Sequence, residues 1–352
     1  MLRVFTIITF LAAAKLNAQQ AIDVIVDKAD AKRIEIKLSE HYLRERDSVH
    51  FFKVWVDGAT TPVMGNVQVK DESRLVFIPI WSFTPGVEYQ VTWKERTVGE
   101  FSIPLRSGAV PTATIYPSTD TIPENLLKLY LVFSEPMREG KSYDYLHILE
   151  GADTLQGVFL ELQPELWNND RTQLTVWLDP GRIKRDLLKN REMGVPIREF
   201  SDYTIIVSSK WKSRIGISMS KDIIKHYYTV EADRKIPDHG AWRIIAPQAN
   251  SKDTLVINFG EPLDYSLAST TLTVSRNGVE INGSSNLTHG ESTWKFWPES
   301  SWKRGSYSLT AESRLEDLAG NNLVRLFDTN LEESKSSITI KGKNIVVPFK
   351  VE

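Results

Sequence analysis

The chain has 352 residues, a formal net charge of −2 and no cysteine. The charge balance argues against a nucleic-acid partner, which normally requires a strongly basic face. The missing cysteines exclude disulfides, thiol nucleophiles and Cys-based zinc sites. The length is too great for one sandwich-sized domain and suits two or three.

The N-terminal residues have the features of a targeting segment. Arg3 provides a positive start before the apolar run 4–14, and the small residue Ala18 precedes two glutamines. The run is shorter than the ~20 apolar residues that a membrane span needs, so the pattern predicts a signal peptide over 1–18. We therefore expect an exported protein, in the periplasm, on the outer surface or outside the cell, with no membrane span after cleavage.

The rest of the chain consists of short runs in which apolar and polar residues alternate, separated by turn signals. Such runs are typical of β-sandwiches. Within 19–106 we expect strands at 22–26, 33–38, 51–56, 75–79, 87–93 and 101–103. Within 107–237 we expect strands at 113–117, 129–133, 146–149, 157–162, 174–178, 203–207 and 226–230. Within 238–352 we expect strands at 242–245, 255–259, 272–275, 279–281, 293–297, 307–311 and 345–351.

Two connections are longer than the rest. The segment between Gly181 and Gly194 is a short helix candidate that interrupts the second group of strands. The polar stretch 332–343 precedes the last strand and predicts a long hairpin or a mobile loop.

The three groups of strands share a repeated order of features. Segment 129–137 reads Leu-Tyr-Leu-Val-Phe-Ser-Glu-Pro-Met, and 255–263 reads Leu-Val-Ile-Asn-Phe-Gly-Glu-Pro-Leu. Each group also has a tyrosine in a late strand, namely Tyr89, Tyr203 and Tyr307. In sandwich folds the hydroxyl of such a tyrosine bonds back to the backbone at a corner. The repeats predict an all-β chain of three tandem Ig-like β-sandwich domains, covering 19–106, 107–237 and 238–352 after the signal peptide.

Two segments are specific enough to suggest a family, namely Phe-Ser-Glu-Pro-Met at 133–137 and Asp-Leu-Ala-Gly-Asn at 317–321. They resemble the bacterial Ig-like domain family of the SbsA type, first known from S-layer proteins. The second domain lacks the Asp-Gly-Asn turn, the third replaces two motif residues with Gly260 and Leu263, and the first diverges most. The resemblance implies an Ig-like fold and an exported, envelope-associated protein. It implies no activity, because such sandwiches host many unrelated functions.

Two glutamates, Glu135 and Glu261, directly precede a proline at a strand end. If Glu261 lies near Asp317 of the final turn, their carboxylates and backbone carbonyls would offer the oxygen ligands that calcium prefers. We therefore consider Glu261 and Asp317 a candidate calcium site. The alternative is that each glutamate accepts backbone N–H bonds in a turn that the proline ends. No EF-hand loop occurs, and no other cofactor is expected.

Tryptophans near the third Phe-x-Pro segment form a candidate binding surface. Trp294 and Phe296 share one face of a strand, so Trp297 points to the other face. If that face is solvated, Trp297 and Trp302 would offer an aromatic surface to a sugar ring or to a partner's apolar patch. The alternative is that one set fills the core and the other covers a junction between domains, since tryptophan is usually mostly buried.

Arg182 and Arg185 belong to the basic insert of the second domain. They are candidates for a positive patch that meets an acidic partner or an anionic envelope polymer. Such basic runs are more often a solvated face without a partner.

No histidine pair, nucleophile elbow or phosphate loop occurs in the sequence. We therefore expect a non-enzymatic, exported Ig-like protein of the cell envelope that acts as a binding, adhesion or structural scaffold module. Its expected partner is an envelope protein or polysaccharide. One alternative is a carbohydrate-binding protein that uses Trp297 and Trp302. The other is an enzyme whose site lies between domains, with Glu135 or Glu261 in it.

Overall fold

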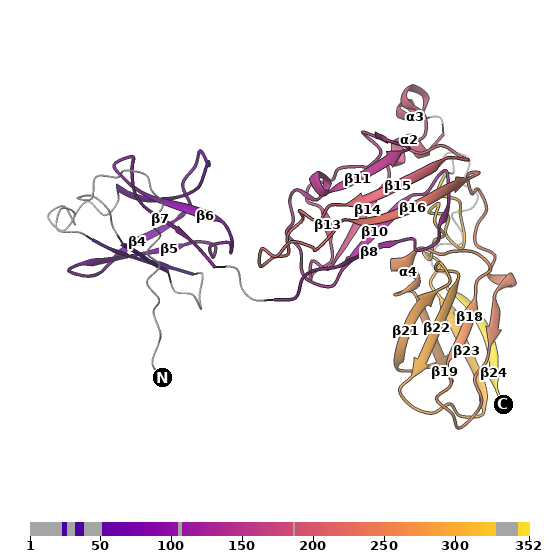
Figure 1. Cartoon of the computed structure of the whole chain (residues 1–352). Coiled ribbons are helices and arrows are strands. Elements are labelled where there is room, and N and C mark those ends of the chain that lie inside the picture. Colours follow the sequence, from indigo (N-terminus) through magenta and orange to yellow (C-terminus); the bar gives the residue numbers. More distant parts are fainter. Residues whose placement is uncertain (1–22, 27–31, 39–50, 105–107, 186, 329–343) are drawn as a thin grey trace. The chain divides into compact units, whose positions relative to one another are not determined.

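The computed structural model describes residues 23–26, 32–38, 51–104, 108–185, 187–328 and 344–352. The chain divides into two compact units. The first comprises the described residues up to Val110 together with Lys212–Ile217, and the second comprises Pro111–Trp211 and Ser218–Glu352. The first unit contains one Ig-like β-sandwich and the second contains two (Figure 1), so the predicted all-β fold of three tandem sandwiches is confirmed.

The first sandwich packs a four-stranded sheet against a three-stranded sheet, and all strand pairs are antiparallel. The larger sheet has the order β1-β2-β5-β4, formed by Asp23–Val26, Ile34–Lys37, Arg74–Pro79 and Gly65–Asp71. The smaller sheet has the order β3-β6-β7, formed by Phe52–Val56, Glu88–Trp93 and Arg96–Ser102. Alternate residues of both sheets, such as Ile36, Leu75 and Val91, are buried in one apolar core.

The second sandwich combines a four-stranded and a five-stranded sheet. The first sheet has the order β13-β14-β10-β8, formed by Leu166–Trp167, Gln173–Trp177, Lys128–Phe133 and Ala113–Tyr116. The second has the order β12-β11-β15-β16-β9, formed by Asp153–Thr154, Leu146–Glu150, Asp202–Val207, Ile223–Val230 and Thr121–Pro123. Strand β9 pairs parallel to β16, and the other pairs are antiparallel.

The third sandwich has two antiparallel four-stranded sheets. One has the order β17-β18-β22-β21, formed by Arg243–Ile245, Leu255–Asn258, Thr293–Pro298 and Gly283–Thr288. The other has the order β20-β19-β23-β24, formed by Val279–Glu280, Leu272–Arg276, Gly305–Ala311 and Ile345–Val351. The buried side chains of Ile257, Trp294 and Leu309 belong to its core.

The single helix expected between Gly181 and Gly194 is instead two short helices, α2 (Pro180–Ile183) and α3 (Leu188–Met193). The first ends because Lys184 is extended, with φ −69° and ψ 122°. The other short helices among the described residues are α4 (Tyr265–Ala268) and the 3-10 helices η2 (Ser142–Tyr145) and η3 (His239–Ala241).

The predicted tyrosine corner is present in all three sandwiches. The hydroxyl of Tyr89 accepts a hydrogen bond from the backbone N–H of Thr84 at 2.9 Å, and that of Tyr203 accepts one from Arg198 at 2.8 Å. The hydroxyl of Tyr307 accepts from the N–H of Lys303 and donates to its carbonyl, both at 3.0 Å. The three rings are buried, so each corner ties a loop to a core position.

The strand assignments differ from the prediction in six places. Five strands were not expected, and all five lie at sheet edges, where a regular apolar alternation is not required: β4, β9, β12, β13 and β21. All of them except β9 are largely exposed. The expected strand at 157–162 is irregular and keeps only an isolated bridge between Phe159 and Leu178.

In the part of the chain that the structure describes, no helix has both the length and the apolar character needed to cross a membrane. The predicted signal peptide, 1–18, and the predicted loop, 332–343, lie outside the described residues. The domain limits after 106 and 237 stay predictions.

Candidate functional site

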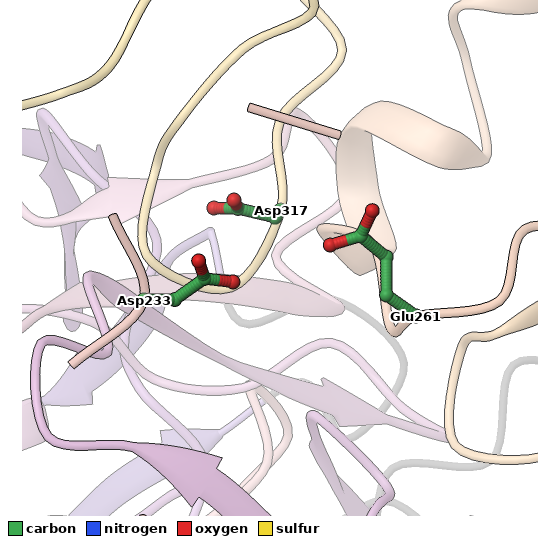
Figure 2. Close-up of side chains that lie close together, drawn as sticks. All are labelled: Asp233, Glu261 and Asp317. Atoms are coloured by element: carbon green, nitrogen blue, oxygen red, sulfur yellow. The ribbon is translucent and has the colours of Figure 1, made fainter. Parts of the chain in front are cut away.

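Three carboxylates from separate segments of the second unit lie together (Figure 2). Asp233 lies between β16 and β17, Glu261 follows β18, and Asp317 lies after β23. One oxygen of each carboxylate lies within 4.8 Å of an oxygen of the other two. The structure thus brings together Glu261 and Asp317, as expected for the candidate calcium site, and adds Asp233, which the sequence analysis missed.

Asp317 is held by the turn that it begins. Its Oδ1 accepts hydrogen bonds from the N–H groups of Ala319 at 2.8 Å and Asn321 at 2.9 Å, and its Oδ2 accepts one from Asn321 Nδ2 at 2.9 Å. Gly320 has φ +80°, a conformation that favours glycine, which explains the Asp-x-x-Gly-Asn pattern. The turn therefore fixes the Asp317 carboxylate in a buried position, with a relative exposure of 2%.

Burial raises the pKa of Asp317 to about 8. The hydrogen bonds from Asn321 oppose this shift, and the negative charges of Asp233 and Glu261 add to it. Burial also raises the pKa of Glu261, and the charge of Asp233 again adds to the effect. Two of the three carboxyls therefore hold a proton more tightly than usual, as expected where like charges share a poorly solvated site.

Asp233 is positioned through its backbone. Its carbonyl accepts hydrogen bonds from Asn125 Nδ2 at 2.7 Å and from Asn321 Nδ2 at 3.2 Å, and its N–H donates to Asn125 Oδ1 at 2.8 Å. Asn125 belongs to the second sandwich and Asn321 to the third. The segment that connects the two sandwiches is therefore tied to both of them at the carboxylate cluster.

The donor set of the cluster fits a hard cation. Its three side chains offer only oxygen, and calcium takes six to eight oxygen ligands, with backbone carbonyls and water completing the set. A site without histidine or cysteine is poorly suited to zinc or copper.

The sequence around Asp233 contains one weak indication of a cation site, because the connecting segment also carries the acidic residues Glu231 and Asp238.

A buried ionic network lies beside this cluster, where the second and third sandwiches meet. Lys128 Nζ lies 2.9 Å from Asp264 Oδ2 and 2.7 Å from Glu316 Oε2. The hydroxyl of Tyr130 donates a hydrogen bond to the Asp264 carboxylate at 2.7 Å. The same carboxylate accepts a hydrogen bond from the N–H of Leu267 and thereby caps the N-terminus of α4. Burial lowers the pKa of Lys128, but the charges of Asp264 and Glu316 raise it further, so the net shift is upward.

One backbone hydrogen bond and several apolar contacts extend the same junction. The N–H of Leu127, in the second sandwich, donates to the carbonyl of Leu318, in the third, at 2.9 Å. Leu318 and Phe327 pack against the core of the second sandwich. The rings of Tyr116 and Tyr265 stack with centroids 3.7 Å apart. The two sandwiches of the second unit therefore share packed apolar contacts as well as the ionic network.

The tryptophans of the predicted aromatic surface do not lie together on a solvated face. Trp302 has a relative exposure of 2%, and its Nε1 donates to the carbonyl of Asp253 at 2.8 Å. The prediction that Trp302 is a surface residue is wrong, because the loop after β22 folds its ring into the core against Tyr307. Trp294 is also in the core, and Trp297 is 38% exposed. A binding role for Trp297 alone stays a prediction.

The two arginines of the predicted positive patch differ in their exposure. Arg182 is buried and donates hydrogen bonds to the carbonyls of Gly157, Gly194 and Val195, so it organises the insert. The prediction that Arg182 belongs to an exposed patch is therefore wrong. Arg185 is exposed and its Nε lies 2.7 Å from Asp328 Oδ2. Any contact of Arg185 with a partner stays a prediction.

Comparisons with known proteins give only distant likenesses. No protein-family model and no curated protein matches the chain. A structure of alpha-2-macroglobulin from Escherichia coli that spans domains MG0-NIE-MG1 is 12% identical, with a TM-score of 0.23, and the match covers 58% of this chain and 67% of that one. The N-terminal part of the bacterial S-layer protein SbsC is 12% identical, with a TM-score of 0.25, and covers 69% of this chain and 44% of that one.

The FN1-FN3 domains of chicken CNTN1 are 8% identical, with a TM-score of 0.21, and the match covers 94% of this chain and 98% of that one. The chain spans less than half of the SbsC structure it matches. Likeness at this level assigns neither a family nor an activity to the chain.

Proposed function

We propose that the chain is an exported, non-catalytic Ig-like protein of the cell envelope that acts as a binding, adhesion or structural scaffold module. The observation that supports this best is the buried network of Lys128, Asp264 and Glu316 between two sandwiches. Domains joined by a chain usually move relative to each other unless their interface is well packed. A buried, hydrogen-bonded charge network favours one defined arrangement of the two sandwiches. Such an arrangement suits a scaffold protein that holds its partners at a fixed spacing.

The first test is a cross-linked pull-down of the tagged chain from intact cells, with an unrelated exported sandwich protein as the control. We expect a specific envelope protein or polysaccharide to co-purify, and the N-terminus of the recovered chain to be Gln19. Recovery from the cytoplasm with an intact N-terminus would contradict export. Hydrolysis by the pure chain that is lost on mutation of Glu135 or Glu261 would contradict the non-catalytic role.

We also propose that Asp233, Glu261 and Asp317 bind a calcium ion that braces the junction of the second and third sandwiches. The support is the approach of three carboxylate oxygens to within 4.8 Å of one another and the raised pKa of Asp317. A bound dication would remove the repulsion between these carboxylates. Because the connecting segment is tied to both sandwiches at Asp233, calcium would strengthen the junction as well as the turn.

The calcium proposal is tested by calorimetric titration of the EDTA-treated full chain with calcium chloride. We expect one site, and a stabilisation of about 2.7 kcal/mol at a calcium concentration one hundred times the Kd. Asp317→Asn should abolish binding. The matched control is Glu135→Gln, which changes the same Phe-x-Glu-Pro motif in the second sandwich and should bind calcium like the wild type. No binding at millimolar calcium, or equal binding by Asp317→Asn, would rule out this site.

A further inference from the structure

The outer face of the β3-β6-β7 sheet in the first sandwich carries a hollow of about 720 Å³. Phe52 and Val54 of β3 point into the core, so the alternate residues Lys53 and Trp55 point outward. The residues that line the hollow include Lys53, Trp55, Gln90, Lys94, Glu95 and Thr97. Neither the carboxylate cluster nor the sandwich junction contributes to it.

Trp55 provides a fixed apolar surface in this hollow. Its Nε1 donates to Thr92 Oγ1 on the neighbouring strand at 2.8 Å, and the side chain is only partly buried. The polar atom of the indole is therefore already bonded within the protein. What the ring still offers to a ligand is its carbon surface, held in one orientation at little further entropic cost.

Polar groups lie around this indole. Gln90 Nε2 donates to Asp57 Oδ1 at 3.0 Å, which orients the amide on the sheet face. Thr97 contributes a hydroxyl, and Lys53 and Lys94 each contribute an ammonium group. The lining thus combines an amide, hydroxyls and charges of both signs, because Glu95 also belongs to it. Such a set can both donate and accept hydrogen bonds without a strong net charge.

This combination fits one class of ligand. A purely apolar ligand would cover these polar groups and remove their water without offering them hydrogen bonds, and a polyanion would require a clear excess of positive charge. A sugar ring has apolar C–H groups on its faces and hydroxyls around its edge, which matches an indole surrounded by donors and acceptors. We propose that the hollow binds a neutral polysaccharide, with one sugar ring packed on Trp55 and its hydroxyls bonded by Gln90 and Thr97.

The test is native gel electrophoresis of the full chain in gels that contain laminarin, dextran or xylan, followed by titration with the polysaccharide that retards it. We expect retardation by at least one of the three. Trp55→Ala should weaken binding by about tenfold or more, which corresponds to ~1.4 kcal/mol. The matched control is Trp81→Ala, because Trp81 is 69% exposed in the same sandwich but does not line the hollow. It should bind like the wild type.

A second variant separates loss of binding from loss of folding. Gln90→Leu removes the amide from the outer face without changing a core residue and should weaken binding while circular dichroism stays unchanged. Trp55→Phe keeps an aromatic ring and should retain more affinity than Trp55→Ala. The proposal is overturned if none of the three polysaccharides retards the chain. It is also overturned if folded Trp55→Ala and Gln90→Leu bind like the wild type, or if Trp81→Ala is equally impaired.

Discussion

The same Phe-x-Glu-Pro sequence occurs at the ends of strands β10 and β18, yet its two glutamates have different surroundings. Glu261 lies beside Asp233 and Asp317. Glu135 belongs to no such group of three candidate ligands among the described residues. The motif ends a strand in both places, and the chemistry of its glutamate depends on what the neighbouring segment brings to it.

The two ends of β10 show the same contrast within one strand. Lys128, at its start, is held between the carboxylates of Asp264 and Glu316, and its side chain is only 10% exposed. Beyond its end, Arg171 and Glu139 form an ion pair at 2.7 Å with exposed fractions of 36% and 50%. Ion pairs of similar length therefore differ in burial, and burial should decide what each contributes to stability.

The largest expected effect is at the buried end. Lys128→Met should lower the free energy of unfolding by about 3–5 kcal/mol, because Asp264 and Glu316 would keep their charges without a buried partner. The matched change Arg171→Met should cost about 0–1 kcal/mol, since the exposed pair is well solvated. Urea unfolding of both variants measures the difference. Equal losses would show that the junction network is no more important than a surface ion pair.

A pH titration of stability in EDTA should report Asp317. Its pKa is raised from 3.8 to about 8 in the folded chain, so the folded state holds a proton that the unfolded state releases. Its contribution is complete below pH 3.8 and is lost as the pH rises towards 8, with a slope of at most about 1.4 kcal/mol per pH unit. Asp317→Asn should flatten this decline. A wild-type stability that rises throughout this interval with the same slope in the variant would contradict the assignment.

The tyrosine corners allow the three sandwiches to be compared. Removing one hydroxyl by Tyr→Phe should cost about 0.5–1.5 kcal/mol. Tyr307 should be at the upper end, because its hydroxyl accepts a backbone N–H and also donates to a backbone carbonyl at 3.0 Å. The hydroxyl of Tyr203 accepts an N–H but donates only at 3.4 Å, to Glu150 Oε1, and that of Tyr89 accepts the N–H of Thr84. Thermal unfolding of the three single variants measures this order. A larger loss at Tyr89 than at Tyr307 would argue against it.

The smallest effects should come from the paired glutamates without calcium. Glu135→Gln should change the free energy of unfolding by less than about 0.5 kcal/mol, as at most surface positions. Glu261→Gln should be neutral or slightly stabilising, because it removes a negative charge next to Asp233 and Asp317. Chemical denaturation of both variants in EDTA tests this. Clear destabilisation by Glu261→Gln would mean that the hydrogen bond which the charged carboxylate accepts from the backbone of Asp238 outweighs the repulsion from the other two carboxylates.

Local patterns in the sequence determined most of the fold. Alternation with a period of two and the turn residues predicted most strands, because both follow from the geometry of a single strand and its turn. The tyrosine corners were predictable for the same reason, since each joins residues four or five positions apart. The five strands that escaped prediction, β4, β9, β12, β13 and β21, all lie at sheet edges, where no regular apolar alternation is required.

Only the tertiary structure decided the sites. Asp233 meets Glu261 and Asp317 because its backbone is tied to Asn125 of the second sandwich and Asn321 of the third, and no local pattern records those contacts. Trp302 was mistaken for a surface residue because it lies in a loop, where the strand period does not apply. Arg182 was expected in an exposed basic patch, but the carbonyls of Gly157 and Gly194, which lie 25 and 12 residues away in the sequence, enclose it. The physical reason is common to all three: burial depends on which distant segments pack together.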